Sequence, residues 1–226
     1  MIYNNILDGV FRSRPSRFVA EVEIASKVEV CHVKNTGRCK EILTPGATVY
    51  VSRTANPNRA TKYDLIAARK GQQVINIDSQ APNRVFYEYL QKGQYIKDIT
   101  HIKPEVKHGG SRFDFYVETA NRKIFIEVKG VTLERDGVAL FPDAPTERGV
   151  RHINELAHCI QDGYEAHVVF IIKMKGVTCF RPNDDIHPAF GEALAAAKAA
   201  GVKVSAFDCV VTPDSLCVSS PVAVHG

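Results

Sequence analysis

Two neighbouring segments, 111–117 and 123–130, carry acidic and basic side chains at a spacing that suits phosphate chemistry. Both segments are strand-like, and they contain Asp114, Glu127 and Lys129. Residues two apart on a strand point the same way, so Glu127 and Lys129 share one face. If the segments pair as a hairpin, Asp114 meets this couple and forms a divalent-metal site with a lysine beside it. The alternative is an ordinary Glu127–Lys129 ion pair on an edge strand.

The ligand types favour a hard cation, Mg²⁺ or Mn²⁺. Such ions prefer carboxylate oxygens, backbone carbonyls and retained water, which Asp114, Glu127 and the carbonyl of Val128 would provide in part. In phosphodiester hydrolysis a bound metal lowers the pKa of water and neutralises charge on the phosphate, while a lysine orients the water. We therefore predict Asp114 and Glu127 as metal ligands and Lys129 as a catalytic residue.

A helix predicted over 84–92 precedes the hairpin, with Asn83 as its N-cap and Gly93 closing it. If this helix packs over the sheet, Glu88 adds a third carboxylate to the cluster, and we predict it as a second catalytic residue. A solvated helix residue is the alternative for Glu88, because glutamate is mostly exposed in proteins.

Polar and basic side chains surround a predicted turn near residue 36, where Gly37 would let backbone N–H groups approach a phosphate. We predict that they bind nucleic acid. They are Arg14, Arg17, His32, Asn35 and Arg38. For His32, a structural role in the turn is an equal alternative.

A second helix is predicted from Thr146, its N-cap, to Gly163. Helix N-termini favour anions, so Arg148 and Arg151 are predicted to contact a phosphate near the metal. His152 is open as a further phosphate contact, and Asp143 is an alternative member of the acidic cluster.

The elements that must position these residues change character near residue 80. Residues 1–80 show five short predicted strands and no helix, which is typical of a small closed barrel of the oligonucleotide-binding (OB) type. The strands are 17–24, 28–33, 48–53, 63–69 and 72–78.

Residues 81–226 alternate strands and helices, which predicts an α/β domain. Strands are predicted at 102–107, 112–118, 123–129, 138–141, 167–172 and 202–207, and a further helix at 188–200. The tail from Ser219 is predicted to fray.

Charge is distributed unevenly over the 226 residues. Residues 1–80 contain 12 Lys/Arg and 7 Asp/Glu, a net +5, while the remainder contains 17 and 18, a net −1, which together give the total of +4. This asymmetry is compatible with an anionic partner at the N-terminal part.

The chain shows no run of roughly 20 apolar residues and no signal-peptide layout, so we expect a cytoplasmic protein without a membrane partner. The six cysteines form no C-x-x-C pair and lie in apolar surroundings, which indicates reduced thiols.

The order Glu88, Asp114, Glu127-Val128-Lys129 resembles the PD-(D/E)XK nuclease superfamily. The whole chain resembles, more closely, the bacterial and archaeal sugar fermentation stimulation protein A family. The matching stretches are 14–18 (RPSRF), 32–38 (HVKNTGR), 45–46 (PG), 82–84 (PNR), 110–115 (GSRFDF), 126–129 (IEVK) and 141–149 (FPDAPTERG), followed by His152 and Leu156. Phe113 precedes Asp114 where the superfamily usually has proline, at a loosely kept position.

The resemblance implies an N-terminal OB-like barrel, a C-terminal α/β domain of PD-(D/E)XK nuclease-like type, and DNA binding with little sequence preference. It also implies a regulatory link to sugar metabolism, maltose in particular. Single-stranded DNA or RNA are alternative ligands. The sequence leaves open whether the protein is a metal-dependent nuclease, a catalytically silent DNA-binding regulator, or a sensor of small anionic metabolites.

Overall fold

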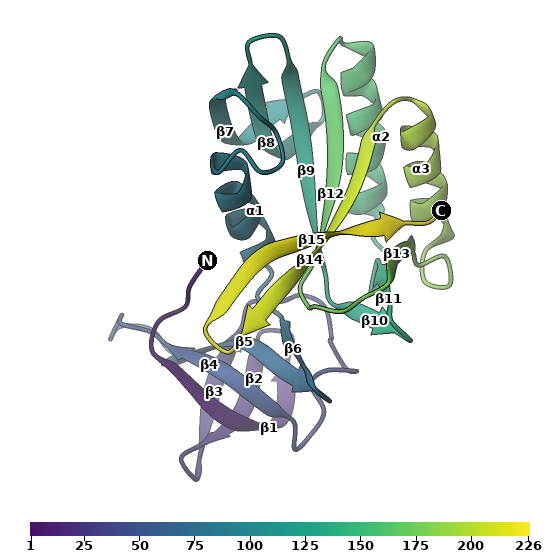
Figure 1. The fold of residues 1–226 in the computed structure, drawn as a ribbon. Helices are drawn as coiled ribbons and strands as arrows, with labels where there is room; N and C mark the ends of the chain where they lie inside the picture. Colours follow the sequence, from purple (N-terminus) through teal and green to yellow (C-terminus); the bar gives the residue numbers. More distant parts are fainter.

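The first six strands form the barrel at the bottom of Figure 1, in a computed structural model that describes residues 1–226. They are β1 (Ile6–Ser16), β2 (Val19–Ile24), β3 (Lys27–Val33), β4 (Thr48–Arg53), β5 (Tyr63–Lys70) and β6 (Gln73–Asn76). The hydrogen-bonding order is β3-β2-β1-β4-β5-β6, and a parallel pairing of β3 with β5 closes the barrel. The predicted OB-like barrel is confirmed.

The predicted set of barrel strands omits β1. Only Gly9 and Phe11 of this strand are buried, so no alternation of apolar residues marks it in the sequence. Gly9 lets β1 approach β2 closely, because a Cβ atom there would lie 2.6 Å from the Val22 side chain.

The rest of the chain forms a nine-stranded sheet with three helices. The helices are α1 (Ala81–Gln91), α2 (Glu147–Gln161) and α3 (Pro188–Ala199). The strands are β7 (Ile99–His108), β8 (Ser111–Thr119), β9 (Lys123–Val131), β10 (Leu133–Arg135), β11 (Val138–Phe141), β12 (Glu165–Ile172), β13 (Cys179–Pro182), β14 (Lys203–Thr212) and β15 (Ser215–Val224). The strand order is β10-β11-β13-β15-β14-β12-β9-β8-β7.

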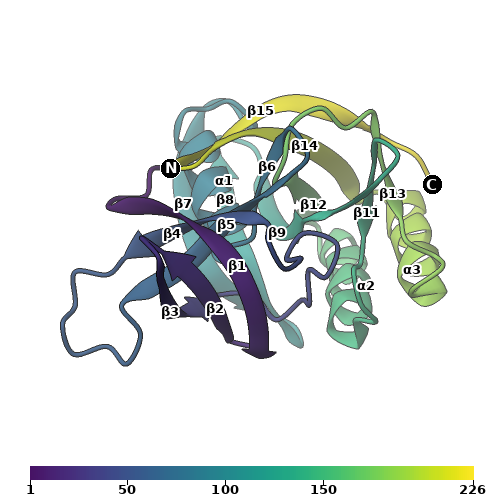
Figure 2. The same cartoon turned by 90° about the horizontal axis from the view of Figure 1, so that it is seen from below.

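At the centre of the sheet, β9, β12 and β14 run parallel. Helix α1 packs on one face, while α2 packs on the other face with α3 beside it (Figure 2). As predicted, Thr146 caps α2: its hydroxyl accepts from the Gly149 N–H at 3.0 Å. The buried residues of α2 recur at helical spacing and form the side of the helix that packs on the sheet. They include His152, Ile153 and Leu156.

Three predictions about elements are wrong. Helix α1 begins at Ala81 with Pro82 in its first turn, so Asn83 is not its cap. The predicted set of strands also lacks β10 and β13. The tail from Ser219 belongs to β15, which lies between β14 and β13 in the sheet.

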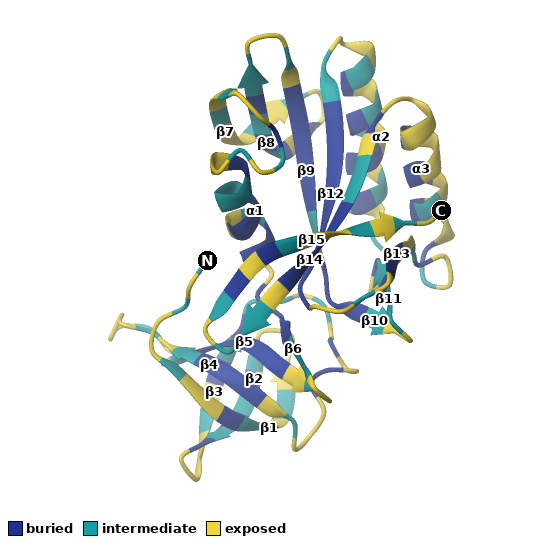
Figure 3. Ribbon diagram, viewed as in Figure 1, coloured by how far each residue is buried: buried dark blue, intermediate teal, exposed yellow.

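The two domains share one apolar core. A cluster of 34 buried residues runs from Phe11 and Val22 in the barrel to Phe170 and Ala206 in the sheet, so the barrel does not have a separate interior. Figure 3 shows buried residues both in the strands of the barrel and in the central strands of the sheet. A second cluster of 16 residues lies between α1 and the sheet. None of the helices is long and apolar enough to cross a membrane.

Candidate active site

The predicted hairpin is formed by β8 and β9, which pair antiparallel as far as Phe115 opposite Ile126. Beyond this pair, the Val128 N–H donates to the Asp114 carboxylate at 2.8 Å. The N–H and C=O of one strand residue point to the same side of the strand. The carbonyl of Val128 therefore also faces Asp114.

Asp114 is held from two elements. One carboxylate oxygen accepts from Val128 on β9, and the other accepts from the side-chain amide of Asn83 on α1 at 2.7 Å. Burial, and then the negative charge of Glu127, raise the pKa of Asp114 to about 6. The site therefore concentrates negative charge, which a bound cation would neutralise.

Glu127 has one occupied and one free carboxylate oxygen. Oε1 accepts from Lys129 Nζ at 2.6 Å and from His152 Nδ1 at 2.5 Å, whereas Oε2 is buried and has no hydrogen-bond partner. Burial alone would raise the pKa of Glu127, but the His152 hydrogen bond and the Lys129 charge hold it below its usual range. A buried, unpaired carboxylate oxygen is costly, so Oε2 is the strongest sign of a missing ligand.

The arrangement fits a hard divalent cation. Oε2 of Glu127, the Asp114 carboxylate and the carbonyl of Val128 are all oxygen donors, and a small cation such as Mg²⁺ normally keeps several waters as its other ligands. No cluster of three or more His, Cys, Asp or Glu side chains arranged to hold a metal ion is present in the structure. The donor set is therefore two carboxylates and one carbonyl.

His152 and Arg148 extend this cluster along α2. The guanidinium of Arg148 can only donate, so its Nε donates to His152 Nε2 at 3.3 Å, which leaves the proton on Nδ1 for the bond to Glu127. The structure thus brings Arg148 to the site, while its contact with a phosphate stays a prediction. His152, left open as a phosphate contact, instead orients Glu127. Its place on the buried stripe of α2 is the signal in the sequence that indicates this role.

Glu88 does not join the cluster, contrary to the prediction. Its carboxylate accepts from the amino group of Met1 at 2.7 Å, and its side chain is 43% exposed. Five residues along a helix correspond to a rotation of roughly 140°. Since Asn83 faces Asp114, Glu88 on the same helix must point elsewhere.

Arg14 and Asn35 build the predicted turn, which corrects their assignment as phosphate contacts. The terminal nitrogens of Arg14 donate to the carbonyls of four residues, Arg17, Asn35, Gly37 and Arg38. The Asn35 side chain donates to the Ile77 carbonyl and accepts from the Gly37 N–H. Both polar groups are therefore used inside the protein.

His32 also takes a structural position. Its Nδ1 lies 3.2 Å from the buried Asp64 carboxylate, which also binds Lys34 and Arg59 at 2.9 and 2.7 Å. Burial would raise the pKa of Asp64, but Arg59 and Lys34 hold it well below its usual range. This geometry fits the structural role that was the alternative assignment for His32, and not a phosphate contact.

Arg17, Arg38 and Arg151 are exposed and make no side-chain hydrogen bond or ion pair, so they are free to meet a partner. Arg38 follows Gly37, where a Cβ atom would overlap the Asp143 carboxylate. The barrel turn therefore lies against the segment that leads into α2. Asp143 belongs to this junction and not to the acidic pair.

Models of two protein families match the chain. One, described as the SfsA N-terminal OB domain, matches residues 13–77, and the other, the sugar fermentation stimulation protein RE domain, matches residues 80–215. Together they cover most of both structural domains.

Curated relatives and one solved structure agree with this match. Sugar fermentation stimulation protein homologs from Clostridium beijerinckii and Desulfitobacterium hafniense are 57% and 59% identical over 216 residues; these cover 96% of this chain in both cases, and 96% and 94% of the relatives. A structure described as Pyrococcus furiosus SfsA in complex with Ca²⁺ has a TM-score of 0.91 and 29% identity, covering 100% of this chain and 98% of that one.

The fold and the site define an OB-barrel protein with a C-terminal α/β domain that carries an acidic pair and a lysine. The chain belongs to the sugar fermentation stimulation protein family.

Proposed function

We propose that this protein binds nucleic acid with little dependence on base sequence, and that its α/β domain carries a Mg²⁺- or Mn²⁺-dependent phosphodiesterase site. The observation that carries the proposal is the unpaired Oε2 of Glu127, next to Asp114 and Lys129. The description of the Pyrococcus furiosus relative as a complex with Ca²⁺ supports a divalent-cation site in the family. A cytoplasmic location and a regulatory link to sugar metabolism are part of the proposal.

In this proposal Asp114, Glu127 and the carbonyl of Val128 hold the metal. When bound, the metal would lower the pKa of water and neutralise charge on the phosphate. The N–H of Val128 and the amide of Asn83 fix the Asp114 carboxylate. Such support matters because hydrolysis requires several groups held in close geometry.

The remaining side chains bind and orient the substrate. Lys129 lies against Glu127 with 13% of its side chain exposed, where it can hold a water or a phosphate oxygen. Arg17 and Arg38 on the barrel, with Arg148 and Arg151 on α2, supply exposed positive charge for backbone phosphates.

A catalytically silent DNA-binding regulator is the second candidate. Oε1 of Glu127 is already occupied by Lys129 and His152, and no third acidic side chain completes the pair. Nucleic-acid binding requires only the exposed arginines, so it does not depend on this geometry.

The test is incubation of the full chain with single- and double-stranded DNA and RNA, with and without Mn²⁺ or Mg²⁺. We expect metal-dependent cutting that Glu127→Gln and Lys129→Met reduce by roughly 100-fold or more, since each removes a group that acts on the transition state. Glu88→Gln is the matched control, because its carboxylate lies outside the site.

Cutting that survives in Glu127→Gln would contradict the assigned site. If no substrate is cut across metals and pH while filter binding stays strong, the protein is the silent regulator.

A further inference from the structure

A polar cavity of about 320 Å³ lies where the barrel meets the α/β domain, and we call it the junction cavity. Its polar lining comes from segments that are far apart in the sequence. The lining side chains that carry the argument are Thr36, Ser79, Thr132, Asp143, Thr146 and Lys173. Thr36, Ser79 and Asp143 are exposed, so the cavity opens to solvent.

The position of the cavity in the fold is one that α/β proteins use for ligands. Strands β9 and β12 run parallel, and their carboxyl ends lie side by side, with Val131 opposite Ile172. Thr132 follows directly after β9 and Lys173 directly after β12. Thr146 caps α2 at the same edge. Ligands in open α/β sheets bind outside the carboxyl ends of the strands.

Lys173 is the unusual residue of this cavity. Only 2% of it is exposed, and its ammonium makes a single hydrogen bond, to the carbonyl of Asp78 at 3.1 Å. No carboxylate lies within ion-pair distance of it. An ammonium has three N–H donors, so two remain unused in a buried position, which is costly without a further partner.

Lys173 also carries its charge at neutral pH. Burial lowers its pKa, and the nearby carboxylates of Asp78 and Asp143 limit the shift, so that the pKa is about 8. The cavity therefore presents a buried positive charge without an ion-pair partner. The backbone of Lys173 is held firmly, because its N–H donates to Val131 and its carbonyl accepts from Asn76.

A ligand that pairs with Lys173 would carry a negative charge, and the other lining groups indicate the chemistry of the rest of that ligand. The hydroxyls of Thr36, Ser79 and Thr132 can donate to phosphate oxygens or bond sugar hydroxyls. Asp143 makes no hydrogen bond or ion pair, and its carboxylate accepts hydrogen bonds but repels an anion. A volume of about 320 Å³ is within the roughly 300–1,000 Å³ range of small-molecule sites, larger than a bare phosphate needs.

We propose that the junction cavity binds a phosphorylated sugar, with Lys173 holding the phosphate and Asp143 accepting from sugar hydroxyls. The ligand is a phosphomonoester, either a free sugar phosphate or the phosphorylated end of a nucleic-acid strand. This inference goes beyond the proposed function, because the cavity does not use the Asp114–Glu127 pair.

Titration calorimetry on the full chain tests the proposal with four probes. These are ribose 5-phosphate, ribose, and an eight-residue oligothymidylate with either a 5′-phosphate or a 5′-hydroxyl. We expect at least one phosphorylated probe to bind at least 10-fold more tightly than its unphosphorylated counterpart, and Lys173→Met to remove that advantage. Preference for the oligonucleotide identifies a strand end, and preference for ribose 5-phosphate identifies a free metabolite.

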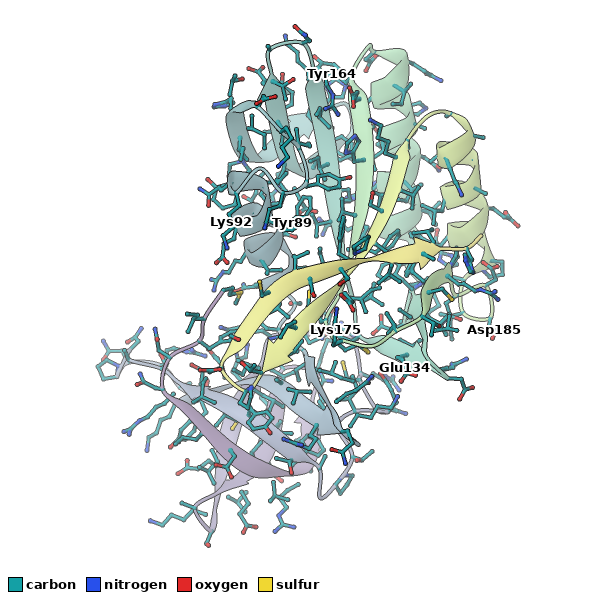
Figure 4. All side chains as sticks on the ribbon, viewed as in Figure 1. Tyr89, Lys92, Glu134, Tyr164, Lys175 and Asp185 are labelled. Carbon is teal, nitrogen blue, oxygen red and sulfur yellow. The ribbon has the colours of Figure 1, made fainter.

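Lys175→Met is the matched control. Lys175, labelled in Figure 4, lies two residues further along, its side chain is 48% exposed, and it pairs with Asp208, so we expect binding within about twofold of wild type. Asp143 is exposed, so Asp143→Asn should leave the fold unchanged. With inorganic phosphate as an additional probe, this variant should weaken the binding of ribose 5-phosphate and not that of phosphate.

Glu127→Gln separates this site from the proposed nuclease. It should leave the affinity gain due to the phosphate unchanged in the ribose and ribose 5-phosphate pair, so a failure of the nuclease proposal would not affect the result. Equal affinities with and without phosphate, or equal effects of Lys173→Met and Lys175→Met, would overturn the proposal.

Discussion

Two arginines three residues apart, Arg14 and Arg17, have opposite environments. The Arg14 guanidinium is bonded to four backbone carbonyls, whereas the Arg17 side chain is exposed and unpaired. Their spacing gives no sign of this difference, because the carbonyls that bind Arg14 are brought to it by the folded turn. The role of a basic residue here depends on its partners and not on its type.

At the residue scale we therefore predict different effects for Arg14→Ala and Arg17→Ala. Arg14→Ala should lower the free energy of unfolding by about 2 to 3 kcal/mol, since it leaves carbonyls without a donor. Arg17→Ala should leave stability unchanged and weaken DNA binding, with the slope of log affinity against log salt reduced by about 1. Urea denaturation and filter binding at several salt concentrations measure both quantities. Equal stability of the two variants would contradict the assignment.

The local sequence of β15 gives little indication that this segment forms a strand. Serine and proline follow one another at 219–221, which is typical of a loop or a fraying end. In the sheet, β15 pairs antiparallel with β14 and parallel with β13, and the Ser220 N–H donates to the buried Asp208. These partners lie elsewhere in the chain, so only the assembled sheet makes the segment a strand.

At the element scale we predict that β15 contributes strongly to stability. Leu216 on β15 is fully buried against α1 and the sheet, so Leu216→Ala should cost about 3 kcal/mol. Val210→Ala on the neighbouring β14 is the control, because Val210 is 46% exposed. Urea denaturation followed by circular dichroism gives both values, and a cost near zero for Leu216→Ala would mean that β15 frays.

The barrel and the α/β domain are joined by more than the chain that connects them. They share the 34-residue core, and the backbone of Asn76 on β6 donates to Lys173 after β12. Lys70 on β5 also pairs with Glu134 on β10 at 2.8 Å. In Figure 1 the β14–β15 hairpin extends down to the barrel, where Ser215 bridges to Ile2.

At the scale of the whole molecule we therefore predict a single cooperative unfolding transition. Far-UV circular dichroism and tyrosine fluorescence should give coincident urea curves, since neither domain can unfold without exposing part of the common core. Hydrogen exchange would show similar protection in β2 and in β12. An early, separate loss of protection in the barrel would show that the domains unfold independently.

Local periodicity made several features predictable. The two-residue repeat of strands places Glu127 and Lys129 on one face, and the cap and apolar stripe of α2 mark that helix from Thr146 onward. The change from closely spaced strands to alternating strands and helices near residue 80 indicates the barrel and the α/β domain. These features depend on neighbours in the sequence, so the sequence determined them by itself.

Only the tertiary structure decided which polar groups meet. It placed Asn83 on Asp114 and His152 on Glu127, and it turned Glu88 away to Met1. It also buried Lys173 between two domains, at the ends of strands whose order no local pattern encodes. The physical reason is that hydrogen bonding and desolvation act between groups close in space, and folding brings such groups together from distant positions in the chain.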